Sequence, residues 1–232
     1  MASSENSVSA APEVLVLVAH PALEQSRINQ RLLRAIGAAG SVDAGASTSR
    51  IVVRDLYALY PDYLIDVQAE RSLLGSAQLV VWQHPIHWYG MPPLMKLWLD
   101  EVLGFGWAYG PGGHALAGKP LWLVASTGSP EEAYHPSGHN RYFFDAFLPP
   151  YEQTATLCGM RFLAPLLLHG AHRVGDAELD AHAALYAQRL AGYPDWPELA
   201  DLADCPACVV PPLARPSDAT PAPAHALTSG AA

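Results

Sequence analysis

Blocks of apolar residues alternate along this chain with segments whose apolar residues recur at helical spacing. Five short runs rich in Val, Leu and Ile have few polar interruptions, which is typical of strands covered on both faces. These runs lie at residues 13–19, 50–55, 78–83, 119–125 and 162–168. Apolar residues spaced by three or four predict helices between the runs. The predicted helices cover residues 26–37, 68–74, 92–103 and 176–191, and a fifth, broken by Pro149-Pro150, ends at Gly159.

The alternation of strands and helices predicts an α/β fold. Right-handed crossovers would place the strands in one parallel sheet with helices on both faces. Five such units match the flavodoxin-like three-layer sandwich, whose five-stranded sheet has the order 2-1-3-4-5. Ligands of such folds bind at the carboxyl ends of the strands, near the point where the strand order reverses. The loops after the first, third and fourth strands are therefore the candidate site.

The chain is long enough for one domain with appendages. It has 232 residues, 50% of them hydrophobic, and we place a single domain at residues 13–195. Residues 1–12 are small and polar and are expected to be disordered. Residues 196–232 are rich in Pro, Ala and Asp and are expected to form a disordered tail. Within the domain, residues 57–67 resemble an ordered Tyr-rich loop and residues 105–118 a small Gly-rich hairpin.

Charge and cysteine content argue against several classes of protein. The net charge is -9 and no basic run is present, so nucleic-acid binding is not expected. No apolar run approaches the roughly 20 residues of a membrane-spanning helix. Three cysteines in a chain of this length do not make a secreted disulfide framework, and they fit a reducing cytoplasm. Cys205 and Cys208 form a CxxC without a second ligand pair, which we interpret as incidental.

The loop after the first strand has features of an anion site. It leads into a helix start, where free N–H groups and the helix dipole attract negative charge. Ser26 adds a hydroxyl, and His20 and Asn29 could donate to phosphate. The alternative is an ordinary turn that ends in an N-cap. The chain has no GxGxxG and no GxxxxGK[ST], which argues against a dinucleotide-binding fold and a P-loop.

The loops after the third and fourth strands could hold a flat ring. Backbone amides in the loop of residues 85–89 could bond a ring edge, and Trp88 would offer an apolar wall. The alternative is that these aromatic residues pack the junction between strand and helix. The hydroxyls of residues 126–129 could also face a ligand, and Gly128 would let the backbone approach it closely. Many strand–helix loops have this composition, so the third loop is weak evidence alone.

Further histidines and a tyrosine are candidates for chemistry. Tyr134 and His139 could polarise or protonate a carbonyl substrate, although a solvated loop would carry such residues as well. His169 and His172 lack an evident third ligand, so no metal site is predicted.

Taken together, the three loops resemble the flavodoxin-like NAD(P)H:quinone oxidoreductases. Within that family the chain is most similar to the ancillary proteins of bacterial glutathione-regulated potassium-efflux systems. The resemblance runs from about Val14 to Tyr193. It rests on AHP at 19–21, SxxN at 26–29, LYxLYPD at 56–62, VWQHPxxWY at 81–89, PPLxKLWxDxV at 92–102, GWAYGxGG at 106–113, LxGK at 116–119 and CG at 158–159.

This resemblance implies a flavin, FMN rather than FAD, held by the three loops. The implied contacts are His20, Ser26, Arg27, Ile28 and Asn29 on the phosphate and ribityl side, Pro85, Ile86, His87 and Trp88 along the ring, and Ser126, Thr127, Gly128 and Ser129 on another edge. The family commonly has TTGG where this chain has Ser-Thr-Gly-Ser at residues 126–129. This difference puts one backbone contact of that loop in question.

The implied activity is FMN-dependent NAD(P)H:quinone oxidoreduction. NAD(P)H would deliver hydride to flavin N5 and leave, and a quinone would then enter the same pocket, giving ping-pong kinetics. Tyr134 and His139 lie at offsets similar to those of the catalytic Tyr and His of animal quinone reductases. The family forms homodimers with pockets at the interface.

Two other functions agree with the same resemblance. The chain could act as a regulatory ancillary subunit that binds the cytoplasmic domain of a potassium/proton antiporter. It would then be a cytoplasmic protein that docks at the inner face of the cell membrane. Reduction of azo or nitro compounds shares the fold and is a further alternative.

Overall fold

Six parallel strands form one sheet in the computed structural model, which describes residues 13–38 and 50–201. The strand order is β2-β1-β3-β4-β5, and β6 also pairs with β4. The strands are β1 (Val14–Val18), β2 (Ile51–Asp55), β3 (Leu79–Pro85), β4 (Pro120–Ser126), β5 (Arg161–Phe162) and β6 (Leu166–Leu168). The predicted flavodoxin-like order is confirmed.

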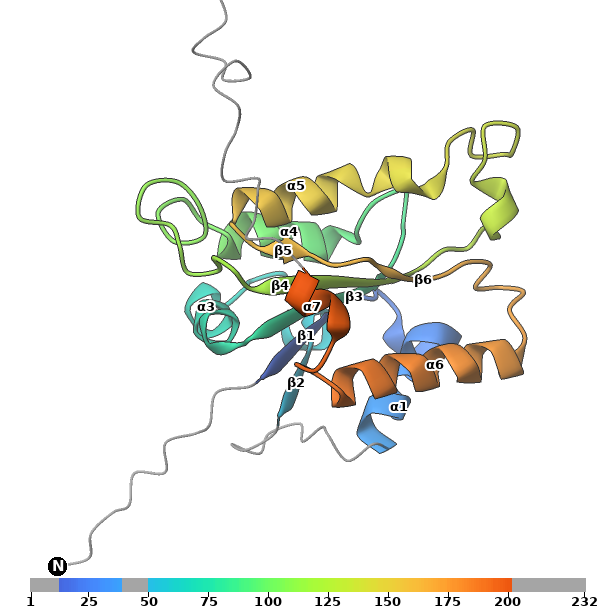
Figure 1. The fold of residues 1–232 in the computed structure, drawn as a ribbon, viewed down its shortest axis with the longest axis horizontal. Coiled ribbons are helices and arrows are strands. Elements are labelled where there is room, and N and C mark those ends of the chain that lie inside the picture. Colours follow the sequence, from blue (N-terminus) through green and yellow to red (C-terminus); the bar gives the residue numbers. More distant parts are fainter. Residues whose placement is uncertain (1–12, 39–49, 202–232) are drawn as a thin grey trace, which may run out of the picture.

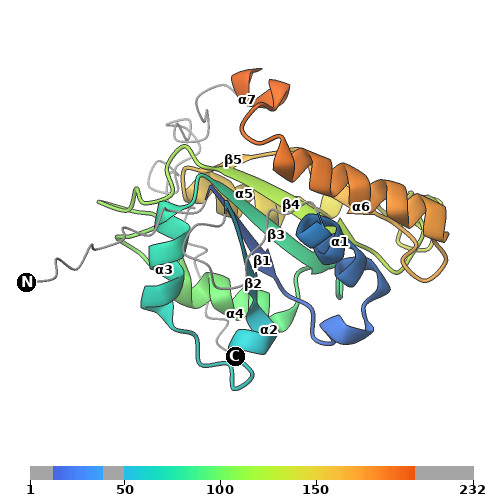
Figure 2. The same cartoon turned by 90° about the horizontal axis from the view of Figure 1, so that it is seen from below.

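Helices cover both faces of this sheet, as Figures 1 and 2 show. One layer contains α1 (Arg27–Ala38) and α6 (Asp176–Ala191), and the other contains α3 (Val67–Ser76), α4 (Pro93–Val102) and α5 (Pro149–Leu157). The remaining helices are short: α2 (Leu56–Leu59), α7 (Pro197–Asp201) and the 3-10 turns Leu23–Gln25, Glu131–Ala133 and Phe144–Phe147. No helix of the described residues is long and apolar enough to cross a membrane.

The apolar runs form central strands because both of their faces are buried. Successive side chains of a strand point to opposite faces of the sheet. In β1, Val14 and Val16 therefore pack in the layer of α1 and α6, whereas Leu15 and Leu17 pack in the layer of α4 and α5. A strand with apolar side chains at every position can therefore pack against the helices on both faces of the sheet.

The predicted strand at 162–168 is wrong as a continuous element. It consists of β5 and β6, which pair with different parts of β4. Pro165 lies between them. Proline has no N–H to donate to the ladder, which explains the interruption.

The structure also differs from the loop predicted at 57–67 and from the hairpin predicted at 105–118. The loop predicted at 57–67 begins inside α2, because Asp55 caps that helix by accepting a hydrogen bond from the Ala58 backbone N–H. Residues 105–118 are a series of turns rather than a hairpin, with one isolated bridge between Phe105 and Tyr109.

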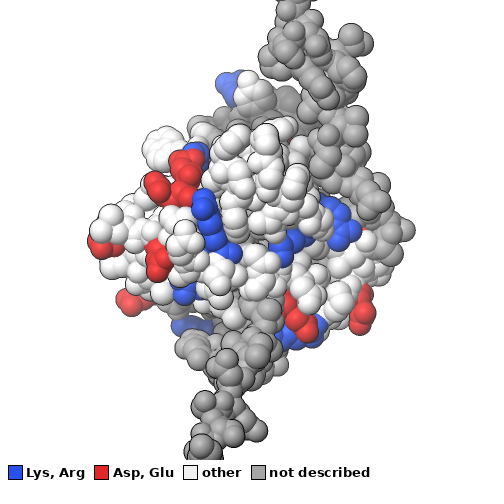
Figure 3. Space-filling view, turned by 90° about the vertical axis from the view of Figure 1, so that its left-hand side faces the viewer, with Lys and Arg blue, Asp and Glu red and all other residues white. Residues whose placement is uncertain are grey.

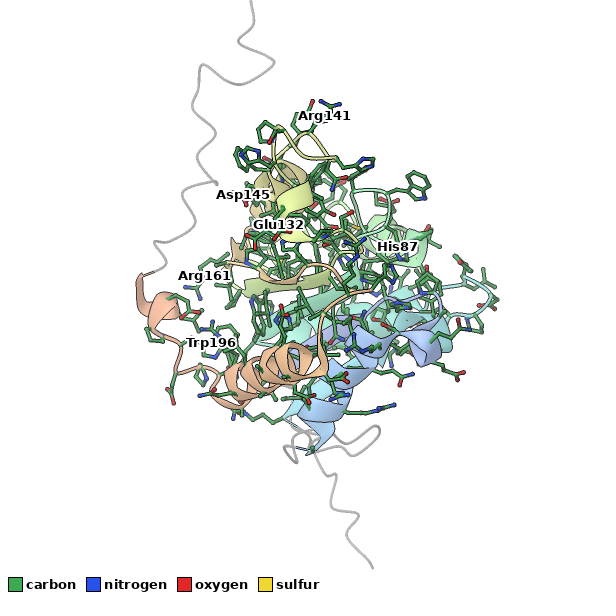
Figure 4. The ribbon with its side chains drawn as sticks, turned by 90° about the vertical axis from the view of Figure 1, so that its right-hand side faces the viewer. His87, Glu132, Arg141, Asp145, Arg161 and Trp196 are labelled. Carbon is green, nitrogen blue, oxygen red and sulfur yellow. The ribbon has the colours of Figure 1, made fainter. Side chains whose placement is uncertain are left out.

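The ordered chain continues past the expected boundary at residue 195. Trp196 is 5% exposed, its Nε1 donates to the carbonyl oxygen of Arg189, and the Arg189 guanidinium lies 4.1 Å from the centre of its ring. Helix α7 follows, and Figure 4 labels Trp196 near α6. Residues 196–201 therefore belong to the described fold, although they were expected to lie in the tail. Cys205, Cys208 and the expected disordered residues 1–12 lie outside the described residues.

A buried carboxylate joins the elements of the second layer. Glu70 of α3 is fully buried and accepts hydrogen bonds from the Tyr60 hydroxyl at 2.6 Å, from Trp98 Nε1 at 3.0 Å and from the Arg54 guanidinium. Burial of a charge is tolerated when it is paired and fully hydrogen-bonded. This group is therefore accounted for by the fold alone.

His84 is a buried polar residue near the end of β3. Its Nδ1 lies 2.9 Å from the carbonyl oxygen of Pro85, and its ring stacks on Tyr151 with centroids 5.7 Å apart. The other ring nitrogen, Nε2, is buried without a hydrogen-bond partner among the described residues. Burial, opposed by the hydrogen bond to Pro85 and assisted by His87, lowers the pKa of His84 to about 4.

The low pKa of His84 predicts a pH-dependent stability. The unfolded chain takes up a proton near the ordinary value of 6.5, whereas the folded protein resists it down to about 4. The unfolded state therefore binds more protons in this window, and the free energy of unfolding falls as the pH drops from 6.5 to about 4. The share of His84 is roughly 3 kcal/mol over the window.

Urea unfolding of the wild type and His84→Phe across this pH range measures that share. The variant is expected to lose less stability on acidification than the wild type. His114→Phe, which replaces an exposed histidine, serves as the matched control and should retain the wild-type slope. Equal slopes for wild type and His84→Phe would contradict the prediction.

Candidate functional site

A cavity of about 570 Å³ lies at the carboxyl ends of β1, β3 and β4. Its size is within the range of small-molecule and cofactor sites. The three loops predicted from the sequence line it together: His20, Ser26, Arg27 and Ile28 from the first, Pro85, Ile86 and His87 from the second, and Ser126, Thr127 and Gly128 from the third. Figure 4 views this end of the sheet and labels His87.

Strand register explains why these loops meet. Val18 at the end of β1 pairs with Gln83 of β3, and Pro85 of β3 pairs with Ser126 of β4. The three strands therefore end at almost the same level of one sheet edge. The chain leaves β1 and β3 toward different sides at the switch point, which opens a crevice between the loops.

His20 acts as a neutral hydrogen-bond donor at neutral pH. Its Nδ1 accepts a hydrogen bond from the backbone N–H of Ala22 at 3.0 Å, so the ring proton belongs on Nε2. Burial, followed by the neighbouring charge of His87, lowers the pKa of His20. The two rings meet edge to face with centroids 6.2 Å apart. Both imidazoles therefore line the same wall.

The start of α1 supplies positive potential to the cavity. Ser26 is the N-cap, because its Oγ accepts the backbone N–H of Asn29 at 3.1 Å. The first turn of α1 contains no acidic residue. The Arg27 guanidinium is held by the Val174 carbonyl and by Asp176, each at 2.7 Å. A fixed guanidinium beside free helix amides is suited to bind an anion.

The third loop is rigid and adjoins a fourth segment. Thr127 Oγ1 donates to the Ser129 carbonyl at 2.7 Å, and the Thr127 carbonyl accepts the Ala171 N–H at 2.8 Å. Ala171 and His172, which lie between β6 and α6, also line the cavity. Sequence reasoning missed both of them. The available signal was their position at the carboxyl end of the fifth predicted strand, which meets the same sheet edge.

Two backbone amides of the second loop have partners within the protein. The N–H of Ile86 donates to the Ser126 carbonyl at 2.8 Å, and the N–H of His87 donates to the Gly90 carbonyl at 2.9 Å. The first bond joins the second loop to the third, and the second bond closes the turn at residues 87–90, so both amides are already used within the protein. Their residues still contribute side chains to the cavity wall.

Three of the residues implied as cofactor contacts do not line the cavity: Asn29, Trp88 and Ser129. Asn29 is 2% exposed, and its side chain bonds Ser26 and Gln83. Trp88 is 95% exposed, with a positive φ of 50°. Trp88 therefore does not form the expected apolar wall within one copy of the chain.

The two residues considered for catalysis lie apart from this cavity. Tyr134 is buried against Phe144 and His169, with ring centroids 5.2 Å and 5.3 Å away. Its hydroxyl interacts with Thr127, so it lies behind the third loop, and burial raises its pKa. His139 is exposed and does not line the cavity.

The face opposite the cavity has mixed charges. On this face, at the amino ends of the strands, Lys and Arg side chains are scattered among acidic ones (Figure 3). Among residues 13–38 and 50–201, no group of three or more His, Cys, Asp or Glu side chains is arranged to hold a metal ion.

Comparison with known proteins agrees with this geometry. The Flavodoxin_2 family, described by its flavodoxin-like fold, matches residues 12–190. The glutathione-regulated potassium-efflux system ancillary protein KefF of Klebsiella pneumoniae is 42% identical over 185 residues, which are 80% of this chain and 97% of KefF.

Two solved structures have the same architecture. The general stress protein 14 of Treponema denticola, in complex with FMN, has a TM-score of 0.69 and 36% identity over 78% of this chain and 99% of its own. An NADPH-quinone reductase from P. pentosaceus has a TM-score of 0.64 and 25% identity over 77% of this chain and 97% of its own. With a family model that covers most of its length and a close relative among the efflux ancillary proteins, this chain belongs to the flavodoxin-like Flavodoxin_2 family.

Proposed function

We propose that this chain is an FMN-dependent NAD(P)H:quinone oxidoreductase that transfers two electrons to a quinone. The observation that carries the proposal is the single cavity in which the loops of β1, β3 and β4 meet beside the start of α1. A related structure, the general stress protein 14 of Treponema denticola, is a complex with FMN, which supports the choice of cofactor.

The donor set of the cavity fits FMN. We assign the phosphate to the end of the cavity near Arg27, the Nε2–H of His20 and the first-turn amides of α1, because these groups all donate. The flat ring would then lie beside the less polar side chain of Ile86 and the loop around Gly128. When bound, FMN would accept and return the hydride that links NAD(P)H oxidation to quinone reduction.

The protein's own residues bind and orient in this proposal. Arg27 is fixed by Val174 and Asp176 before any ligand arrives, so little entropy is lost when it meets an anion. NAD(P)H and the quinone would occupy the same open side of the cavity in turn, which predicts ping-pong kinetics. Tyr134 and His139 lie outside this cavity in one copy of the chain, so the proposed hydride transfer does not depend on either of them.

A homodimer would complete this site. Trp88, Tyr142 and Phe143 are large aromatic residues that are more than half exposed in one copy of the chain. Exposed aromatic groups beside a cavity are typical of surfaces that a partner covers. We propose that a second copy covers Trp88 and encloses the substrate.

A second candidate function is that of an ancillary subunit. The 42% identity to KefF over 97% of that protein favours it. In this role the chain would dock from the cytoplasm on an antiporter domain, with the bound flavin as a structural element. Reduction of azo or nitro compounds would use the same cavity.

Turnover of the purified protein tests the enzyme proposal. The protein is expected to bind FMN and to appear yellow, to bleach with NADH or NADPH, and to regain its colour when a benzoquinone is added. Initial rates at several concentrations of both substrates should give parallel double-reciprocal lines. A protein that takes up no FMN would contradict the proposal, whereas FMN binding without turnover and with capture of an antiporter domain would favour the ancillary role.

Replacement of His20 tests the phosphate end. His20→Ala removes a donor to a charged acceptor, and such a bond contributes about 1.5 to 3 kcal/mol, so the Kd of FMN should rise roughly 10- to 100-fold. Flavin fluorescence titration measures the change. His114→Ala, at an exposed histidine outside the cavity, should bind FMN like the wild type. Unchanged affinity of His20→Ala would show that His20 does not contact the phosphate.

A further inference from the structure

A buried chain of hydrogen bonds runs from α6 through β3 to the first turn of α1. The hydroxyl of Tyr186 donates to Oε1 of Gln83 at 3.0 Å, and Nε2 of Gln83 donates to Oδ1 of Asn29 at 3.2 Å. Nδ2 of Asn29 then donates to Oγ of Ser26 at 3.2 Å. Tyr186 and Gln83 are fully buried. We call these three residues, Tyr186, Gln83 and Asn29, the relay.

The buried hydroxyl of Tyr186 determines which way the amide groups of the relay are turned. If Gln83 were turned so that its amino group faced Tyr186, the phenol proton would need another acceptor inside the apolar layer of α1 and α6. Leaving a buried donor unsatisfied costs about 1 to 3 kcal/mol. The observed orientation also lets Gln83 Nε2 reach the backbone carbonyl of Asn29 at 3.4 Å. The amide groups therefore point their donors toward α1.

This direction decides what the Ser26 hydroxyl can do. A hydroxyl oxygen has two acceptor positions and one proton. Both acceptor positions of Ser26 are used, one by the side chain of Asn29 and the other by its backbone N–H at 3.1 Å. The proton of Ser26, which lines the cavity, is left for a ligand. Ser26 is thus a donor and not an acceptor toward whatever binds there.

We infer that the relay is a positioning device that makes the cavity select a phosphorylated flavin over its neutral form. Phosphate oxygens accept hydrogen bonds, and the groups around them here, Ser26, His20 and Arg27, all donate. Riboflavin ends in a hydroxyl, whose own proton has no acceptor among these groups. The inference rests on the proposed binding of FMN and names the residues that set its specificity.

The ratio of the Kd of riboflavin to the Kd of FMN measures this selectivity. Ser26→Gly removes the hydroxyl at little cost to the helix, because glycine is a tolerated N-cap. Loss of one charge-assisted bond should lower the ratio about tenfold. Ser26→Thr keeps a hydroxyl and should keep the ratio. Thermal melting of each variant confirms that it is folded.

Tyr186→Phe tests the relay itself. The substitution removes the proton that orients Gln83, so the amides can reverse and Ser26 can donate to Asn29 instead. The ratio should fall about three- to tenfold, with the Kd of riboflavin unchanged. Tyr193→Phe, which changes a buried tyrosine in the same layer, is the matched control and should leave the ratio unchanged. In the Ser26→Gly background, Tyr186→Phe should have no further effect on the ratio, because the two act as a unit.

The outcomes separate this inference from the proposed function. A wild type that binds neither flavin would overturn both. A wild type that binds both flavins equally, or a Tyr186→Phe variant that keeps the wild-type ratio, would overturn the inference and leave FMN binding intact. If Tyr186→Phe does not fold, an unchanged ratio in Ser26→Gly would overturn the inference.

Discussion

The common level at which β1, β3 and β4 end is the constraint on which the rest of the site depends. Parallel pairing sets Val18 beside Gln83 and Pro85 beside Ser126, so three loops far apart in sequence start from one edge. Two backbone hydrogen bonds then bind the loops to their neighbours, from Ile86 to Ser126 and from Ala171 to Thr127. The cavity is thus a property of the sheet, and its lining side chains are attached to a rigid frame.

The end of β3 shows how a buried strand carries polar groups toward a site. Gln83 and His84 are both fully buried, and as neighbours they point to opposite layers. The amide of Gln83 is hydrogen-bonded to α1 and α6, whereas one ring nitrogen of His84 has no partner within residues 13–38 and 50–201. Buried polar groups cost free energy unless they are hydrogen-bonded. The amide of Gln83 does not titrate and adds no pH dependence, whereas His84 makes the fold sensitive to acid.

The sequence was enough to predict the sheet order and the three loops, because strand identity depends on uninterrupted Val and Leu runs and the site follows from topology. It could not reveal that Asn29 turns inward, because that depends on Gln83 from a strand more than fifty residues away. The sequence places Trp196 in a disordered tail, because Pro, Ala and Asp dominate there without periodicity, although its ring is buried against Arg189. The interruption of the last strand, by contrast, could have been predicted from Pro165.

Both proposed roles, quinone reductase and ancillary subunit, require the phosphate end of the cavity to retain the flavin. An enzyme with ping-pong kinetics must keep its cofactor while one substrate leaves and the next arrives, and an ancillary subunit must keep it while docked. The phosphate would lie at Ser26, Arg27 and His20, apart from the ring where electrons are exchanged. Contacts of this kind stabilise every redox state equally and therefore act on affinity rather than on the rate of the chemical step. The relay is consequently expected to govern retention of the flavin, and the loops of β3 and β4 its reactivity.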